Sequence, residues 1–107
     1  MKKYIYLSLL GILLIACNSS KSLYKKGVKL QDRDLHEKAC IYFIQSLDKR
    51  PEFTDANIAL KTSGQRVVNY YLDEFFKAKS FQKDKDAVYH YRSAIIFQKK
   101  IKNYNIN

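Results

Sequence analysis

Apolar and polar positions along this 107-residue chain follow a helical period almost throughout. After a first apolar run, from Tyr4 to Ala16, apolar residues recur every three or four positions, which is the spacing of one face of a helix. Strand-like alternation bounded by turn residues is missing, and the sequence has one proline and three glycines. The pattern predicts an all-α fold with helices at about 21–31, 35–49, 53–79 and 85–102.

The first two of these segments predict a helical hairpin. Each segment has small or apolar residues at helical spacing along one face, and these faces are expected to meet. Pro51 ends the second helix, because a proline ring disfavours helical backbone at the preceding residue and lacks an N–H donor. The inner faces are Leu23, Gly27 and Leu30 on the first helix, and Leu35, Ala39, Cys40, Phe43, Ile44, Ser46 and Leu47 on the second.

The connection between these two helices contains a helix-start signal. Residues 32–34, Asp-Arg-Asp, are expected to form a tight turn. Asp34 is followed by Glu37 at the spacing of a capping box, in which two side chains pair with unsatisfied backbone N–H groups. We therefore expect Asp34 to be the N-cap of the second helix.

The third segment is long enough to contact both of its neighbours. Its first half is expected to pack on the first hairpin and its second half on the last helix. Gly64 costs about 1 kcal/mol relative to Ala in a helix, so the sequence predicts one long helix but leaves open a kink or break at this residue. Residues 80–84 are the predicted loop and 103–107 a frayed tail. The predicted inner residues are Ala56, Ala59, Leu60, Val67, Val68, Tyr71 and Phe75 in the third helix, and Ala87, Tyr91, Ala94, Ile95 and Gln98 in the last.

The first hairpin resembles a tetratricopeptide repeat. That family combines a glycine and an aromatic residue in its first helix with Ala-x3-Phe in the second and a closing proline. Lys26 stands where the family prefers Leu, and a leucine replaces its usual aromatic residue. The matching residues are Leu23, Gly27, Leu30, Ala39, Phe43 and Pro51.

A degraded second copy begins 48 residues after the first, with Phe75 in place of the glycine. The family repeat is about 34 residues long, so this offset leaves room for about one additional helix. The helical domain, residues 21–102, would then comprise a first repeat at about 20–53, a connecting helix at about 54–66 and a degenerate second repeat at about 67–101. In the second copy, Tyr71, Phe75 and Ala78 correspond to Leu23, Gly27 and Leu30, and Ala87, Tyr91 and Ala94 correspond to Ala39, Phe43 and Ser46.

The first apolar run predicts an export signal. Two lysines precede the 13 residues from Tyr4 to Ala16. A helix of that length rises about 20 Å, which is less than the roughly 30 Å hydrocarbon core of a bilayer. Residues 14–17, Leu-Ile-Ala-Cys, resemble the lipobox of bacterial lipoproteins. An ordinary secretory signal with an unrelated cysteine is the alternative interpretation.

The lipobox resemblance implies where the mature chain begins and what holds it. In that family the signal, here residues 1–16, is removed, and diacylglycerol and fatty acyl groups are attached to the cysteine, here Cys17. Residues 17–20 would be the lipidated cysteine and a short tether. Because two or more acyl chains anchor a protein stably, the resemblance implies membrane attachment in the bacterial cell envelope. The membrane would be the outer one in a Gram-negative cell and the cell membrane otherwise.

The charge of the mature chain is strongly positive. The full sequence has 20 Lys and Arg against 10 Asp and Glu, and removal of residues 1–16 leaves 18 against 10. Such a balance is typical of nucleic-acid binding, but an exported protein does not meet the chromosome, so no nucleic acid is expected. Anionic lipid, acidic glycans or an acidic protein surface are the expected counterparts. A basic face that is only solvated is the simplest alternative.

Few residues suggest chemistry. With Cys17 lipidated, Cys40 has no partner for an internal disulfide and is predicted to be a core residue. His36 lies one helical turn before Cys40, but zinc needs three or four ligands. Asp34 and His36 are the only catalytic candidates, and no phosphate-binding loop or nucleophile motif accompanies them. We therefore expect no enzyme activity, no metal and no cofactor beyond the lipid.

These observations favour a lipid-anchored helical-repeat module that binds another envelope protein or a peptide. Repeat arrays need about three units and this chain has roughly two, which leaves three alternatives for covering the exposed surface: the extra segment of about 14 residues, self-association or a partner. The alternative is a small structural lipoprotein whose basic surface contacts anionic lipid or cell-wall polymer. The tetratricopeptide resemblance implies a partner groove on the exposed faces of the first helices of the repeats, formed by Lys21, Tyr24, Val28, Gln31, Leu72, Phe76 and Lys79.

Overall fold

The computed structural model describes residues 19–104, and this part of the chain is all-α, as the pattern predicts. No strand occurs among these residues, and each helix begins and ends within one residue of its predicted range. The predicted export signal, residues 1–16, and Cys17 lie outside the described residues. The helices are α2 (Ser20–Asp32), α3 (His36–Lys49), α4 (Thr54–Ser80) and α5 (Asp84–Lys102).

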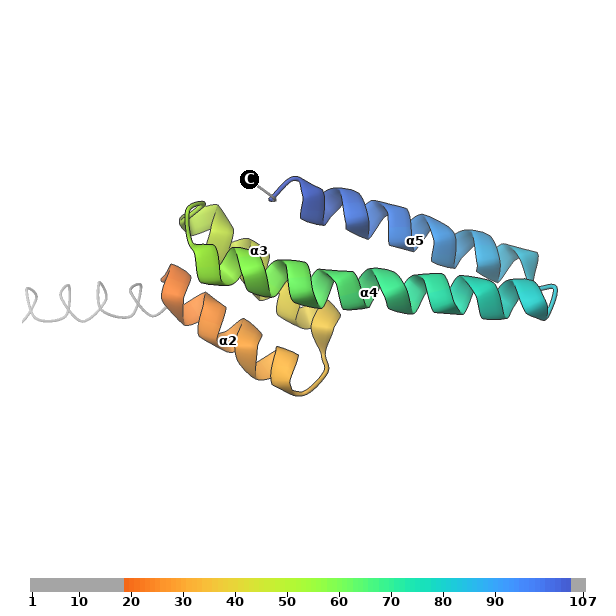
Figure 1. The fold of residues 1–107 in the computed structure, drawn as a ribbon, viewed down its shortest axis with the longest axis horizontal. Coiled ribbons are helices and arrows are strands. Elements are labelled where there is room, and N and C mark those ends of the chain that lie inside the picture. Colours follow the sequence, from red (N-terminus) through yellow and green to blue (C-terminus); the bar gives the residue numbers. More distant parts are fainter. Residues whose placement is uncertain (1–18, 105–107) are drawn as a thin grey trace, which may run out of the picture.

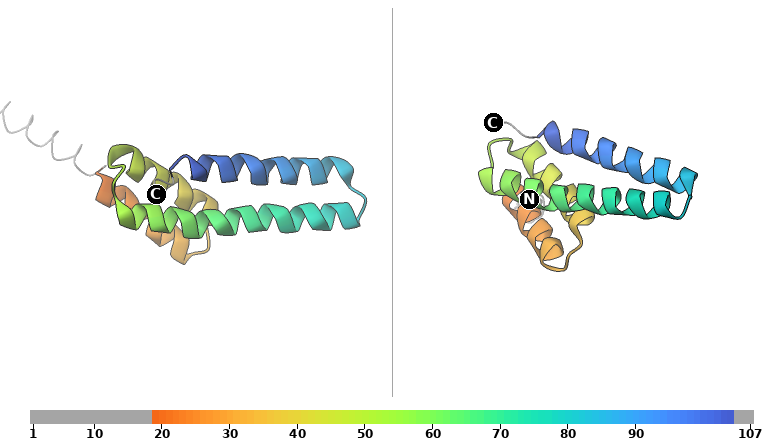
Figure 2. Two further views of the ribbon diagram at one scale, coloured as in Figure 1. Left: turned by 45° about the horizontal axis from the view of Figure 1, so that its top comes forward. Right: turned by 45° about the vertical axis from the view of Figure 1, so that its right-hand side comes forward.

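The four helices form two hairpins of unequal length. α2 pairs with α3, and α4 pairs with α5 (Figure 1). α4 packs on the α2–α3 hairpin along its first half and as far as Tyr71, whereas its last turns extend beyond that hairpin with only α5 beside them. The further views keep α5 on the opposite side of α4 from α2 (Figure 2). The molecule therefore has a thick end near its N-terminus and a thin end at the α4–α5 turn.

The core lies where α3 meets α2 and the first half of α4. Phe43 is its largest fully buried side chain. The ring of Phe43 packs directly on the backbone of Gly27, so closely that a Cβ at Gly27 would overlap it, with ring atom Cδ1 only 2.7 Å away. Close approach of α2 and α3 thus requires a glycine at this position. The core residues are Ala39, Cys40, Phe43, Ile44, Leu47, Ala56, Ala59, Leu60 and Val67.

The turn between α2 and α3 differs from the predicted capping box. Asp34 has a left-handed backbone with φ of 59°, and its N–H donates to the carbonyl of Gln31. The N–H of Leu35 donates to the carbonyl of Leu30, so this turn closes the C-terminus of α2. Leu35 is the N-cap of α3 and is 42% exposed, not on the inner face. The N-cap prediction for Asp34 is wrong because aspartate also tolerates the left-handed backbone that ends a helix.

The turn between α4 and α5 has the same hydrogen-bond pattern. Gln82 also has φ of 59°, and its N–H donates to the carbonyl of Lys79. The N–H of Lys83 donates to the carbonyl of Ala78 at 2.8 Å. These residues lie 48 positions after their counterparts in the first turn. The two hairpins are therefore closed in the same way at the predicted repeat offset.

α4 runs through Gly64 without a break, as one long helix. Gly64 is buried, and a Cβ there would lie 3.0 Å from Cγ1 of Ile101 and closer still to its Cδ1. The missing side chain thus leaves room for Ile101 of α5. Helix propensity describes a residue within its own helix and does not include contacts with other helices. Here the contact between α4 and α5 stabilises helical backbone at Gly64.

The end of the described chain is fixed on the core. The backbone carbonyl of Tyr104 accepts a hydrogen bond from Nδ2 of Asn57 at 2.7 Å, and the ring of Tyr104 packs against the core. A hydrogen bond to Asp48, together with partial burial, raises the pKa of the Tyr104 phenol. The predicted frayed tail therefore does not include Tyr104, and residues 105–107 lie outside the described part.

Candidate functional site

Exposed apolar side chains gather on the thin end of the molecule, residues 70–96, which we call the distal hairpin. It comprises the second half of α4, the turn and most of α5. Seven of the ten large hydrophobic side chains that are exposed in the described part lie on it, with exposed fractions of 48–74%. Large apolar side chains are thus exposed more often on this hairpin than on the rest of the described part. The seven residues are Tyr70, Phe76, Phe81, Val88, Tyr89, Tyr91 and Ile96.

An open groove with a volume of about 540 Å³ runs along the distal hairpin. It follows α5 from Asp84 to Ile96, which is about 18 Å along the helix axis. At its centre the rings of Phe75 and Tyr91 pack with centroids 5.4 Å apart. Lys79, Asp84 and Arg92 contribute charged groups to the lining. The apolar lining is Phe75, Ala87, Val88, Tyr91, Ile95 and Ile96.

α5 has two apolar faces. One packs against α4, and the other lines the groove. Ala87 and Ala94 are 6% and 2% exposed against α4, as expected. Tyr91, which was also expected to face inward, is 48% exposed, and Gln98 is exposed as well. Sequence reasoning did not single out the groove. The sequence did contain a signal for it: α5 has more large apolar residues than a helix needs in order to pack against a single neighbour.

Three of the four groove residues predicted on α2 lie against the rest of the domain. The Tyr24 ring packs between Phe43 and Phe53, with centroids 5.9 and 5.2 Å away. Val28 packs against the core, and Nε2 of Gln31 donates to Ser63 on α4. Only Lys21 is fully exposed. These side chains therefore join α2 to α3 and α4.

The residues predicted from the second copy lie on the distal hairpin. Lys79 lines the groove, and its Nζ lies 5.8 Å from the centroid of the Phe75 ring. Phe76 is 62% exposed, and Leu72 is half-buried. Phe76 is 13 positions after Ser63, or about 20 Å further along α4. The structure does not bring these residues and those of α2 together around one groove.

A short polar chain joins three helices at the two catalytic candidates. The Nδ1 atom of His36 lies 3.0 Å from Oγ of Ser63, and Nε2 of His36 lies 3.4 Å from Oδ1 of Asp34. Nε2 of Gln31 donates to the same Ser63 hydroxyl at 2.8 Å. The hydroxyl hydrogen is thereby free to point at Nδ1, which favours the histidine tautomer protonated at Nε2.

The order Ser63, His36, Asp34 is that of a hydrolytic triad, but the placement is different. Ser63 is 0% exposed, so its hydroxyl does not face a space where a substrate would bind. The distance from His36 to Asp34 is also longer than a charge-assisted hydrogen bond. This cluster ties α2, α3 and α4 together, and Ser63 is a residue that sequence reasoning missed.

Cys40 is the free thiol of the described part, and it is fully buried in the core, as expected. Burial, with a smaller contribution from the charge of Glu37, raises the pKa of this thiol to about 12. Within residues 19–104, no group of three or more His, Cys, Asp or Glu side chains is arranged to hold a metal ion. None of the helices in this part is long and apolar enough to cross a bilayer.

Comparison with known protein families, with curated proteins and with solved structures finds no match for this chain. The functional interpretation therefore depends on the groove, on the distribution of charge and on the residues around Cys17.

Proposed function

We propose that this protein is a lipid-anchored helical module of the bacterial envelope that binds a helix of another envelope protein. The distal hairpin supplies the binding surface, and Cys17 supplies the anchor. The observation that carries the proposal is the exposed apolar groove beside α5. The lipobox-like residues 14–17 support the anchoring part.

The shape of the groove favours a helical occupant. Its length of about 18 Å corresponds to roughly three turns of helix, or about 12 residues. An amphipathic helix places residues i, i+3, i+4 and i+7 on one side, which suits a groove lined by aliphatic and aromatic side chains. Such a helix would cover Val88, Tyr91 and Ile96, which are each about half exposed or more.

The charges at the groove indicate the chemistry of the occupant. Lys79 and Arg92 line it with one carboxylate, that of Asp84. The site therefore has an excess of one positive charge next to its apolar floor. We expect the partner helix to have an apolar stripe flanked by acidic residues, because complementary charge on the rim favours encounter and fixes orientation.

The repeat interpretation belongs to the same proposal. The two hairpins have equivalent turns 48 residues apart, and the corresponding small residues Ala39 and Ala87 are both buried. Ser46 and its counterpart Ala94 are also buried. In a stack of hairpins, each unit covers the apolar face of the one before it. The partner helix would take the place of a following unit on the distal hairpin.

The proposal is tested by site-specific crosslinking in the intact envelope. A photoreactive residue replaces Val88 in the groove, and the chain is expressed with its own signal. The decisive comparison uses Ile96→Asp, which places a carboxylate in the groove, and Ile58→Asp as a matched control on the first half of α4. Ile96 and Ile58 are 65% and 57% exposed, so neither substitution disturbs the core.

We expect a crosslinked product from position 88 that disappears with Ile96→Asp and persists with Ile58→Asp. A product that is indifferent to Ile96→Asp, or the absence of any product, would overturn the groove as a binding site. A product with twice the mass of the chain would identify a second copy as the occupant and contradict the proposed partner.

A further inference from the structure

The exposed face of α2 is almost entirely basic. Five cationic side chains on α2 and its C-cap are exposed, and two exposed carboxylates, Asp32 and Asp34, flank the last of them. No ion pair within 4 Å involves these cations in the described part. Helical spacing places Lys21, Lys25 and Lys29 on the side of the helix opposite Leu23 and Gly27, which are buried, and Lys26 on the flank of that side. The five are Lys21, Lys25, Lys26, Lys29 and Arg33, which we call the basic face.

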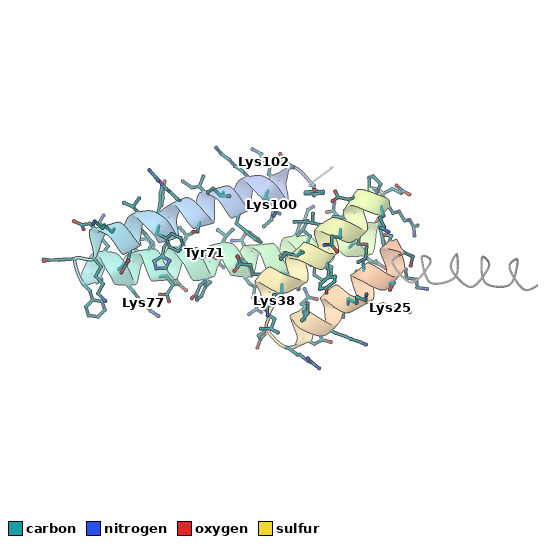
Figure 3. The ribbon with its side chains drawn as sticks, turned by 180° about the vertical axis from the view of Figure 1, so that it is seen from behind. Lys25, Lys38, Tyr71, Lys77, Lys100 and Lys102 are labelled. Carbon is teal, nitrogen blue, oxygen red and sulfur yellow. The ribbon has the colours of Figure 1, made fainter. Side chains whose placement is uncertain are left out.

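The positive charge of the domain is concentrated at the thick end that includes this face. Residues 70–96 have five Lys and Arg against four Asp and Glu. The remaining described residues have 13 against six. Figure 3 shows Lys25 on α2 and Lys77 far along the distal hairpin, at opposite ends of the domain. The distal hairpin is therefore nearly neutral, while the end beside the N-terminus is strongly positive.

The basic face follows directly after the predicted anchor. Only two residues, Asn18 and Ser19, separate Cys17 from the start of α2 at Ser20, a span of at most about 10 Å. This is comparable to the distance of about 8 Å over which charges are screened at physiological salt. α2 itself is about 20 Å long, and Lys side chains reach several ångströms further. An anchor at Cys17 would hold the basic face within electrostatic range of the lipid headgroups.

We propose that the basic face binds the phosphate groups of anionic lipids and orients the domain on the membrane. This inference rests on the proposed anchoring at Cys17. Lipid is the favoured polyanion because an anchored chain always lies beside it, whereas a wall polymer or an acidic protein has to reach the site. A cluster of four or more cations next to a membrane attachment point is typical of anionic lipid binding.

The orientation has a consequence for the groove. α5 lies on the opposite side of α4 from α2 (Figure 2). When α2 lies on the headgroups, α5 and the groove beside it are held away from the bilayer. The basic face thus separates the membrane contact from the partner contact.

Lysine footprinting of the full chain tests the basic face. The chain is extracted from the membranes of expressing bacteria and reconstituted into vesicles of phosphatidylcholine alone, or of phosphatidylcholine with phosphatidylglycerol. Acylation rates are then measured for Lys21, Lys25 and Lys29. Lys77, Lys83 and Lys85 are matched controls, since they are exposed lysines of the distal hairpin in the same molecule.

With phosphatidylglycerol we expect the three α2 lysines to react about fivefold more slowly, the effect of roughly one lysine–headgroup contact. Added salt should remove the protection, and the control lysines should react equally in both vesicles. In Lys25→Gln/Lys29→Gln, protection of Lys21 should fall, whereas Lys83→Gln/Lys85→Gln should leave it intact.

Equal rates for the α2 lysines in the two vesicles would overturn the basic face as a lipid contact. Failure of the anchor gives a different result, because the chain would then not remain with pure phosphatidylcholine vesicles. In that case the acylation rates with phosphatidylglycerol vesicles are compared with the rates in solution, without vesicles. Slower acylation of the α2 lysines with phosphatidylglycerol would still support the basic face as a lipid contact.

Discussion

At the scale of single residues, two buried glycines allow close helix contacts but differ in what they contact. Gly27 lies against the ring of Phe43, which is fully buried and has no space into which to move. Gly64 lies against the end of the Ile101 side chain, which is only partly buried. The same substitution should therefore have different effects at the two positions.

Gly27→Ala should lower the free energy of unfolding by about 1–3 kcal/mol, since it overpacks a rigid contact. Gly64→Ala should change it by less, because Ile101 can turn away and alanine adds about 1 kcal/mol of helix propensity. Urea unfolding followed by circular dichroism measures both variants against the wild type. A larger loss for Gly64→Ala than for Gly27→Ala would contradict the contacts described.

The hydroxyl of Tyr71 joins α4 to the start of α3. It donates to both carboxylate oxygens of Glu37 at 3.1 Å. Burial, followed by this hydrogen bond and the charge of Glu37, raises the pKa of Tyr71 from 10.0 to about 12. Because the folded state holds this proton more tightly than the unfolded state, the contribution to stability is present below pH 10 and is lost as the pH rises through about 12.

Tyr71→Phe should therefore be less stable than the wild type near neutral pH, and the difference should disappear as the pH rises above 10. Denaturant unfolding at several pH values measures it. Tyr89→Phe is a control, since Tyr89 is 62% exposed. A difference that persisted unchanged to pH 12 would show that the hydroxyl proton is not involved.

At the scale of elements, the sequence predicted the helices much better than the joints between them. The helical period and Pro51 place the helix ends to within one residue. The turn at Asp34 was missed because one side chain suits both a helix start and a left-handed helix end. The groove was missed because Tyr91 and Ile95 have the spacing of a core face, and only the arrangement in space shows that α4 covers a neighbouring face of α5.

The polar joint at Ser63 also needed the three-dimensional structure. Gln31 and His36 are far from Ser63 in sequence but bond to the same hydroxyl. Ser63→Ala would leave two polar groups of α2 and α3 without this partner. We expect the free energy of unfolding to fall by about 1–3 kcal/mol.

Ser93→Ala is the matched control for this joint. Its hydroxyl donates only to the carbonyl of Tyr89 in the same helix, so we expect a change within about 0.5 kcal/mol. Urea unfolding measures both variants. Equal effects of the two substitutions would mean that the Ser63 cluster does not join the helices.

At the scale of the whole molecule, the domain has a basic thick end and a nearly neutral apolar thin end. The basic face lies next in sequence to the predicted anchor, and α5, which supplies most of the groove lining, lies on the opposite side of α4 from α2. If the chain is anchored as proposed, this division places most of its positive charge beside the membrane. It also explains how one small domain would contact a membrane and a protein at once.

Anchoring at Cys17 is the central claim, because the orientation and the setting of the groove both depend on it. Growth with labelled palmitate, followed by isolation and intact mass measurement of the chain, tests it most directly. We predict a labelled product that begins at Cys17, is heavier than residues 17–107 alone and remains in the membrane fraction. Cys17→Ala should be unlabelled and keep its signal. Unchanged labelling of Cys17→Ala, or an unlabelled wild type, would contradict the account.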